Sequence, residues 1–260
     1  MLSFADPDLR QQIEALPEGT ALIGISTTGK AIAVDLDGES PHALVCTASG
    51  STTMLRSLTA QFLRQGAHAL VLDPKRIFHL WAKGLPTVTH RGNIAGIHDA
   101  LVHLATELER RLDLDGDLDT VPRLIVAVDE ANATLPRLAR YWETFRQKDD
   151  PKTSPAIAAL EEALWVGRAA HVHVIFDGRP QPTVLRSAAR ELFATVILAR
   201  FTADTWQALV PDAGPAPKQR HPQQGHFHVI QHGEVNETQA IQMTDADVVA
   251  WLTDPEDPES

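Results

Sequence analysis

Short apolar runs, each with the length and composition of a buried strand, recur along the chain between longer segments. The runs occupy residues 42–47, 69–74, 123–130, 172–178 and 195–200. The longer segments have apolar residues at helical spacing and lie near residues 52–65, 93–112, 134–147, 155–170 and 183–194. In the first of them, Leu55, Leu58 and Phe62 fall on one helical face. The alternation predicts an α/β fold in which helices cover both faces of a mainly parallel sheet.

Both ends of the chain predict smaller additions to this core. Two apolar runs near the start are separated by Thr-Thr-Gly, and a similar pair lies near the end, so each end predicts a small β-hairpin. A short helix near residues 245–251 and an acidic, proline-containing tail follow the second pair. The expected division is an N-terminal helix and hairpin in 1–41, the core in 42–210, and a linker, hairpin, short helix and tail in 211–260.

Composition and charge narrow the classes of function. The 260 residues are 43% apolar, which is enough for a substantial core, and acidic residues outnumber basic ones by 34 to 23, giving a formal charge of −11. This balance argues against a surface that coats nucleic acid by charge alone. The single cysteine, Cys46, excludes an internal disulfide and any metal site built on cysteine pairs. The sequence shows neither a membrane-spanning run nor a signal peptide, so we expect a cytoplasmic protein.

The segment LVCTASGSTTMLRSL, residues 44–58, is the first candidate for chemistry because it leads from a buried strand through small residues into a helix. Phosphate loops occupy this position, with glycines that expose backbone amides, a lysine for the outer phosphates and a hydroxyl for magnesium. The candidate nucleotide-binding residues are Thr47, Ala48, Ser49, Gly50, Ser51, Thr52 and Thr53, with Thr52 in the magnesium position. Taken alone, the same spacing equally fits a helix that begins with Ser and Thr residues.

An acidic pair supports the phosphate-loop interpretation. Asp129 and Glu130 end the apolar run RLIVAVDE, about 80 residues after the loop. In that order, the aspartate of a nucleotide hydrolase holds magnesium and the glutamate polarises the attacking water. Asp129 and Glu130 are therefore the candidate catalytic residues, and Asp129 is a candidate magnesium ligand together with Thr52.

These motifs together resemble the motor domain of the FtsK/SpoIIIE family of DNA-pumping ATPases, over roughly residues 20–250. The resemblance rests on PHALV, the glycine-serine loop, MLRSL, ALVLDPKR, LIVAVDE and GRAAHVHVIFDGRP. It implies a RecA-like P-loop NTPase core that uses ATP and Mg²⁺. It also implies a homo-oligomeric ring acting on double-stranded DNA, and actinomycete plasmid-transfer proteins are the most similar type.

Two departures from the family pattern affect the expected activity. The loop lacks the Gly-Lys pair, and Gly178 in FDGRP stands where the family has a glutamine that senses the γ-phosphate. Loss of a charged contact to the transferring phosphate commonly costs on the order of 3 kcal/mol, or about a hundredfold in rate. We therefore expect weak or absent ATP hydrolysis. The alternatives are a non-catalytic scaffold or regulatory subunit that partners an active FtsK-like ATPase, and a secretion-motor module of the EccC type.

The remaining candidates favour structural roles. The histidine pairs His171/His173 and His226/His228 alternate with apolar residues and lack a third metal ligand at a known spacing. The five tryptophans fall mostly at apolar positions of expected helices, which predicts core or interface packing. Arg179 and Arg186 are candidates to face the nucleotide of a neighbouring subunit, although surface arginines more often have no such role. The acidic segment 113–119 is expected to be a solvated turn because it lacks the glutamate of a calcium loop.

Overall fold

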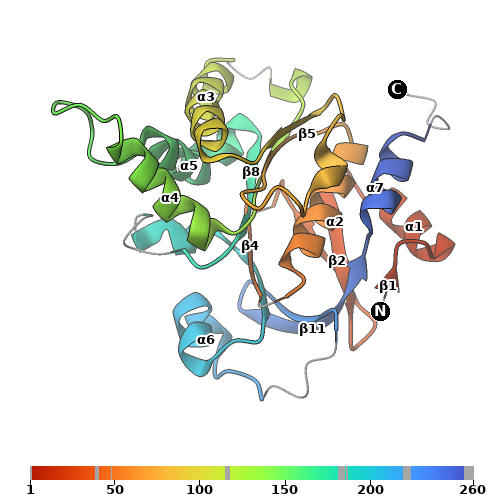
Figure 1. The fold of residues 1–260 in the computed structure, drawn as a ribbon. Helices are drawn as coiled ribbons and strands as arrows, with labels where there is room; N and C mark the ends of the chain where they lie inside the picture. Colours follow the sequence, from red (N-terminus) through yellow and green to blue (C-terminus); the bar gives the residue numbers. More distant parts are fainter. Residues whose placement is uncertain are drawn as a thin grey trace.

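The computed structural model describes residues 2–38, 41–47, 49–114, 118–180, 185, 187–218 and 224–254. Its strands are β1 (Leu2–Ser3), β2 (Thr20–Ser26), β3 (Ala31–Asp35), β4 (Ala43–Thr47), β5 (His68–Leu72), β6 (Val88–Arg91), β7 (Leu124–Val128), β8 (Val172–Asp177), β9 (Thr195–Ala199), β10 (His226–Gln231) and β11 (Glu234–Gln242). They form one 11-stranded sheet in the order β3-β2-β11-β10-β9-β4-β8-β7-β5-β6, with β1 beside β11. Figure 1 shows this sheet between two groups of helices.

The sheet has a parallel part and an antiparallel part. Strands β9, β4, β8, β7, β5 and β6 pair with one another in parallel. The two predicted hairpins, β2–β3 and β10–β11, are present, and they join the sheet beyond β9 by antiparallel pairing. The prediction of an α/β fold with a mainly parallel sheet is confirmed, and the terminal hairpins continue the central sheet.

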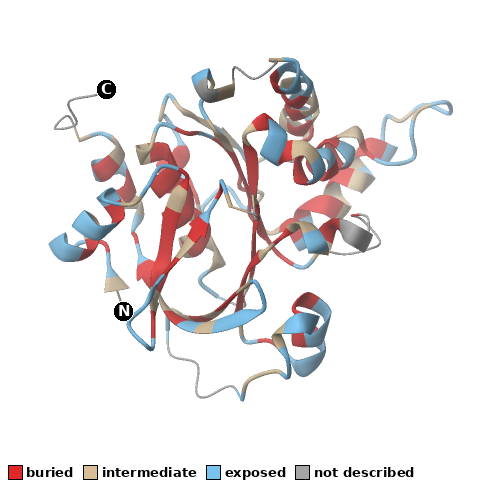
Figure 2. Cartoon of the chain, turned by 180° about the vertical axis from the view of Figure 1, so that it is seen from behind, coloured by how far each residue is buried: buried red, intermediate tan, exposed pale blue. Residues whose placement is uncertain are grey.

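The helices are α1 (Pro7–Glu14), α2 (Ser51–Arg64), α3 (Ile94–Leu112), α4 (Ala131–Glu143), α5 (Pro155–Val166), α6 (Ala203–Leu209) and α7 (Asp245–Leu252). Helices α1, α2 and α7 share one apolar cluster with the sheet, and α3, α4, α5 and α6 share a second one. In Figure 2 buried residues, drawn in red, occur on the strands and on helices at both sides of the sheet. Among the described residues, no helix combines the length and apolar character that crossing a bilayer requires.

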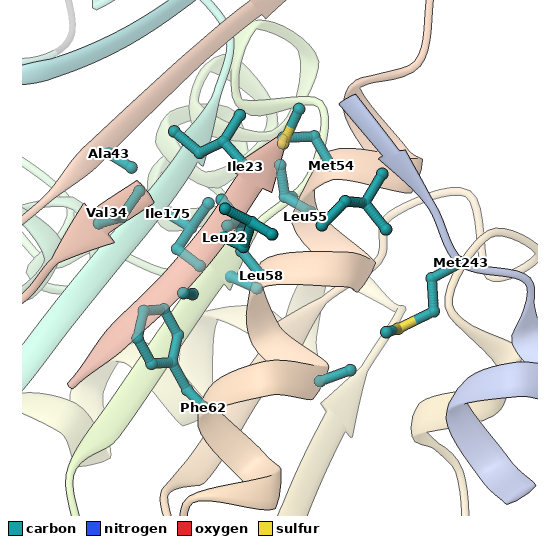
Figure 3. Packing of buried hydrophobic residues seen from close by; sticks show 14 of the residues in the cluster. Leu22, Ile23, Val34, Ala43, Met54, Leu55, Leu58, Phe62, Ile175 and Met243 are labelled. Atoms are coloured by element: carbon teal, nitrogen blue, oxygen red, sulfur yellow. The ribbon is translucent and has the colours of Figure 1, made fainter. Parts of the chain in front are cut away.

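Helix α2 is fixed on the sheet by a deeply buried apolar face. Leu55, Leu58 and Phe62 are each at most 1% exposed, and Figure 3 shows them against Leu22 of β2 and Ile175 of β8. The spacing of these side chains follows the helical repeat, so one face of α2 is continuous with the core. This packing fixes where the first turn of α2 lies, at the end of β4.

The structure differs from the sequence prediction in several elements. A helix was expected near residues 183–194, but the described part of that segment has a 3₁₀ helix at Ser187–Leu192, with residues 181–184 and 186 outside the description. The edge strand β6 and the short helix α6 were not predicted. Both are short, and β6 has the sequence VTHR, which has little apolar alternation.

Candidate functional site

The candidate site lies at the carboxyl ends of the parallel strands. Thr47 ends β4, Asp177 ends β8, Asp129 directly follows β7, and Asp73 directly follows β5. These strands are consecutive in the order β4-β8-β7-β5, so their carboxyl ends meet along one edge of the sheet. Ligands of open α/β sheets bind at this edge. The fold therefore brings the loop and the acidic pair, which are distant in sequence, to the same place.

The loop after β4 is short. Gly50 has a φ of 91° and is the N-cap of α2, and Met54 N donates the first helical hydrogen bond to Gly50 O at 3.0 Å. Ser51, Thr52 and Thr53 therefore form the first turn of the helix, and the candidate Ala48 lies outside the described residues. Three residues, 48–50, separate the end of β4 from the start of α2, so the connection between them is short. The loop sequence supplies no lysine.

An aromatic side chain of the C-terminal hairpin closes the space beside this loop. A Cβ on Gly50 would lie 3.0 Å from Cζ of Phe227 in β10. The cavity between the loop and the hairpin measures about 120 Å³ and is lined by Ser49, Gly50, Thr53, Met54, Phe227 and neighbouring residues. Ligand pockets for molecules of nucleotide size usually have about 300–1,000 Å³. The cavity between the described part of the loop and Phe227 is therefore smaller than a nucleotide pocket.

Asp129 is a buried carboxylate without hydrogen bonds. It is 1% exposed, and neither carboxylate oxygen has a hydrogen-bond partner among the described residues. Nε2 of His79 lies 3.3 Å from Asp129 Oδ2 without hydrogen-bond geometry, and the carboxyl group of Asp177 also interacts with Asp129. A buried charged group in this state calls for a ligand, because leaving it unpaired is costly.

The tautomer of His79 follows from a second contact. Trp81 Nε1 donates to His79 Nδ1 at 3.3 Å. An indole nitrogen can only donate, so Nδ1 accepts and the ring proton of neutral His79 lies on Nε2. His79 and Trp81 were not among the residues that the sequence pointed to for the site, and their relation to Asp129 depends on the turn after β5.

Asp177 is a second carboxylate at the site, and the sequence analysis gave it no role. Burial and then the nearby Asp129 carboxylate raise its pKa to about 7, and the Ser51 side chain opposes this shift. Asp177 Oδ2 also accepts a hydrogen bond from Glu130 N at 3.3 Å. Asp129 and Asp177 form an acidic cluster, and the first turn of α2 contacts this cluster through Ser51. An available signal was the acidic residue at the end of a third apolar strand, where Asp177 follows Val172–Phe176.

Glu130 points to a different partner. It has a φ of 50° at the start of α4, and its side chain forms an ion pair with Lys75. This contact is the main reason that the pKa of Lys75 is raised, with smaller contributions from Asp129 and Asp177. Lys75 therefore lies at the rim of the acidic cluster. Both side chains of the pair are more than a third exposed, so the pair contributes little to stability.

The other residues of the DPK motif shape the turn after β5. Asp73 is fully buried and accepts hydrogen bonds from Arg76 N at 2.8 Å and from Phe78 N and His79 N at 3.3 Å each. Burial by itself would raise the pKa of Asp73, but the amides of His79 and Arg76 and other contacts hold it below its ordinary value. Asp73 thereby fixes the turn that presents Lys75 and His79 to the site.

Gly178 is adjacent to the site but faces α4. A Cβ on Gly178 would lie 3.0 Å from Asn132 Oδ1, and Arg179 N donates to that same oxygen at 3.0 Å. Arg179 also donates to Thr205 of α6. The arginine proposed to face a neighbouring subunit is therefore bonded within the chain, while Arg186 lies outside the described residues.

A larger cavity of about 1040 Å³ lies beside β9, β10 and α6. Arg179 and Arg190 line it. Arg190 donates through Nη1 to Phe193 O at 3.0 Å and through Nε to Leu209 O, and burial lowers its pKa. Both arginines are thus bonded to the protein itself, which favours a structural role for them.

The histidine pairs and tryptophans mostly serve packing. His173 is 1% exposed with Nδ1 3.0 Å from Pro41 O, and His228 packs against Phe201 and Trp206. Four tryptophans are buried in the core, and Trp165 is 49% exposed, so for Trp165 the prediction of core or interface packing stays a prediction of interface packing. Within the described ranges, no group of three or more His, Cys, Asp or Glu side chains is placed to hold a metal ion.

The predicted magnesium pair is only partly assembled. Asp129 lies at the centre of the acidic cluster, and its orphaned oxygens suit a hard cation such as Mg²⁺. The hydroxyl that reaches the cluster is that of Ser51, through Asp177, and no contact joins Thr52 to Asp129 among the described residues. The donor atoms of Asp129 are of the type that a magnesium ion takes, and the loop sequence offers no lysine to the phosphates of a nucleotide.

Comparison by sequence finds no matching family model and no matching curated protein. Comparison by structure finds the conjugation coupling protein TcpA of pCW3, solved as a monomer with ATPγS, with a TM-score of 0.69 and 20% identity over 90% of this chain and 69% of TcpA. It also finds EccC of Thermomonospora curvata, ATPases 2 and 3 with a signal sequence peptide, with a TM-score of 0.62 and 18% identity over 89% of this chain and 43% of that one.

A third similar structure is the genome packaging NTPase B204 of Sulfolobus turreted icosahedral virus 2 with ATPγS. It has a TM-score of 0.51 and 13% identity over 78% of this chain and 99% of B204. All three likenesses are below 25% identity and concern the fold. They confirm the predicted RecA-like P-loop fold of the FtsK/SpoIIIE-type ATPases.

Proposed function

We propose that this chain, which has the fold of the FtsK/SpoIIIE-type P-loop ATPases, is a subunit of a DNA-transfer machine with weak or no ATP hydrolysis of its own. In that role it forms a ring with copies of itself or with an active ATPase, and it reaches double-stranded DNA only through such a ring. The similarity to TcpA, described as a conjugation coupling protein, supports the DNA-transfer part of the proposal.

One observation supports the loss of hydrolysis above the others. Helix α2 begins at Ser51 immediately after Gly50, and the cavity beside this turn measures about 120 Å³. A phosphate loop needs several consecutive free amides and a lysine to surround the phosphates. Here the amides that follow Gly50 belong to the first turn of α2, and Phe227 packs close to Gly50.

Calorimetric titration with ATP and Mg²⁺ tests this proposal. Three proteins are compared: the unmodified chain, a variant with Gly-Lys inserted between Ser51 and Thr52, and a matched variant with Gly-Ala inserted there. We expect no binding by the unmodified chain and binding by the Gly-Lys variant. The Gly-Ala variant restores loop length without charge, and we expect its affinity to be lower by about a hundredfold, which is typical for loss of a charged phosphate contact. Tight ATP binding by the unmodified chain would contradict the proposal.

A second candidate function is a secretion-motor module. The similarity to EccC with a bound signal sequence peptide favours it, and a formal charge of −11 makes unassisted DNA binding unfavourable. DNA binding measured by fluorescence anisotropy over a series of salt concentrations separates the two functions. Affinity that falls steeply with salt supports the DNA role, and absence of binding together with capture of a signal peptide supports the secretion role.

A further inference from the structure

We propose that the turn after β5, residues 74–83, is a docking surface for a segment of a partner protein that carries both acidic and apolar side chains. We call residues 74–83 the basic turn. Such a surface goes beyond the proposed function, because it serves equally in a chain that binds ATP and in one that does not.

The basic turn lies in a stretch whose charge is opposite to that of the rest of the chain. Residues 74–98 contain no acidic residue. Their four basic residues, all of them exposed, are Lys75, Arg76, Lys83 and Arg91. The rest of the chain has the other 19 basic residues and all 34 acidic ones, so its formal charge is −15. Within the described part of the chain, Lys75 is ion-paired with Glu130 and the other three have no ion pair. Such a local basic surface attracts an acidic partner.

Exposed apolar side chains lie among these cations. Ile77 is 63% exposed and Leu80 is 47% exposed, and Ile77 is the most exposed large apolar residue that the structure describes. Apolar side chains surrounded by a polar rim are typical of protein–protein contacts. Interfaces with nucleic acid are more polar. The basic turn therefore favours a protein partner over a nucleic acid.

Buried contacts fix the conformation of the basic turn. The buried carboxylate of Asp73 accepts hydrogen bonds from three backbone amides of the turn. Arg76 has a φ of 64°, in the left-handed region that favours glycine, and its Nε donates to Gly92 O at 3.3 Å. Strained backbone of this kind persists where its surroundings hold it, and it is concentrated at binding sites. A preformed turn loses little backbone entropy when a partner binds.

The exposed side chains define the chemistry of the partner. A guanidinium can bind a carboxylate through two parallel hydrogen bonds, and Arg76 and Arg91 each present one. Ile77 and Leu80 gain from burial only against other apolar side chains. The segment that fits therefore combines aspartate or glutamate with aliphatic or aromatic residues.

Selection from a random peptide library on the immobilised full chain identifies the preferred segment, and fluorescence anisotropy of an enriched peptide measures its affinity. The test variants are Leu80→Ser and Lys83→Glu. The matched controls are Val235→Ser and Lys152→Glu, which make similar changes at exposed positions of β11 and of the loop after α4. Circular dichroism melts check that each variant is folded.

We expect the enriched peptides to carry acidic and apolar residues. Their affinity should fall at least about tenfold in each test variant and stay unchanged in both controls. Failure to enrich acidic peptides, or equal peptide binding by all of these proteins, would overturn the inference.

Two further measurements identify other occupants of the basic turn. If a DNA duplex binds the unmodified chain more tightly than the peptide and is lost in the same test variants, the turn serves nucleic acid. If sedimentation shows a dimer that Lys83→Glu dissociates and Lys152→Glu does not, the occupant is a second copy of this chain. Either result would contradict a separate acidic partner.

Discussion

At the scale of single residues, His42 shows how burial fixes a protonation state. Val174 N donates to His42 Nδ1 at 3.0 Å, and His42 Nε2 lies 3.0 Å from Leu164 O. A backbone N–H can only donate, so Nδ1 accepts and the neutral ring donates from Nε2. Protonation would place a second proton against Val174 N–H. Burial accordingly lowers the pKa of His42 to about 4, against the effect of nearby backbone acceptors.

The lowered pKa of His42 predicts that the free energy of unfolding falls as the solution becomes more acidic. The folded pKa lies below the unfolded one, so the unfolded chain takes up a proton first as pH falls below about 6.5. The contribution of His42 is therefore fully present above that pH and is lost progressively towards pH 4, by roughly 3 kcal/mol in all. His173, whose pKa burial lowers to about 3, acts in the same direction.

Urea unfolding at about pH 7 and about pH 4 measures the effect. We expect His42→Gln to be less stable than the natural chain at the higher pH but to lose less stability on acidification. His103→Gln on the exposed face of α3 is the control and should leave the pH dependence unchanged. An unchanged acid loss in His42→Gln would show that this ring is not the cause.

The residues of the site were only partly predictable from the sequence. Asp129 and Glu130 stand at the end of a long apolar strand, and strand ends meet at one edge of a parallel sheet, so their placement followed from pattern. Asp177 ends an equally apolar strand, so the same pattern places it at this edge of the sheet. The His79–Trp81 contact depends on the turn that Asp73 holds after β5, and no sequence periodicity encodes such a turn.

At the scale of elements, α2 supplies hydrogen bonds that the sheet does not. Strand β2 pairs with β11 only at Gly24–Ser26, so the earlier residues of β2 lack a strand on that side. Gln61 fills the gap: Leu22 N donates to its Oε1 at 2.7 Å and its Nε2 donates to Leu22 O at 3.0 Å. Gln65 does the same for Gly19 N and Thr20 O. The helix thus replaces part of a strand.

Loss of the hydrogen bonds between Gln61 and Leu22 should destabilise the folded protein. Gln61 is 1% exposed. Gln61→Met keeps the side-chain volume but leaves the backbone N–H and C=O of Leu22 buried without hydrogen-bond partners. We expect the free energy of unfolding to fall by about 2–3 kcal/mol, since an unsatisfied buried polar group costs about 1–3 kcal/mol. Chemical denaturation measures the loss, and Gln12→Met on the exposed face of α1 is the control. Equal stability of the two variants would mean that water forms hydrogen bonds to the backbone N–H and C=O of Leu22 in place of Gln61.

The elements that sequence periodicity predicted are those with strong apolar patterns. Strands β4, β5, β7, β8 and β9 were recognised because both of their faces are buried. Strand β6 has only 4 residues and no fully buried position, and α6 has only 7 residues, too few for a repeat to be visible. The failure near residues 183–194 has a similar cause, because a 3₁₀ helix does not follow the 3.6-residue period.

At the scale of the whole molecule, the two chain ends are joined through the sheet. Strand β11 lies between β10 and β2, and β1 pairs with β11, so the N-terminal and C-terminal hairpins are neighbours. Sequence analysis located both hairpins but not their pairing, because long-range register leaves no local signal. Phe4, which follows β1, also packs against Trp251 of α7, with ring centroids 4.7 Å apart and ring planes tilted by 52°. One apolar cluster therefore contains residues from both ends and from the centre.

This arrangement predicts that residues 42–210 do not fold alone. Without the two hairpins, β9 loses the pairing of Leu198 and Val196 with β10 and becomes an open edge. Helix α2 would lose the cover of β2, β11 and α7, so buried apolar side chains such as Leu58 and Met54 would contact water. We expect the fragment to lack a cooperative thermal transition and to bind a hydrophobic dye, whereas residues 1–254 melt cooperatively. Cooperative melting of the fragment would instead show that residues 42–210 fold without the two hairpins. The contact between Phe227 and the loop after β4 would then no longer argue against nucleotide binding.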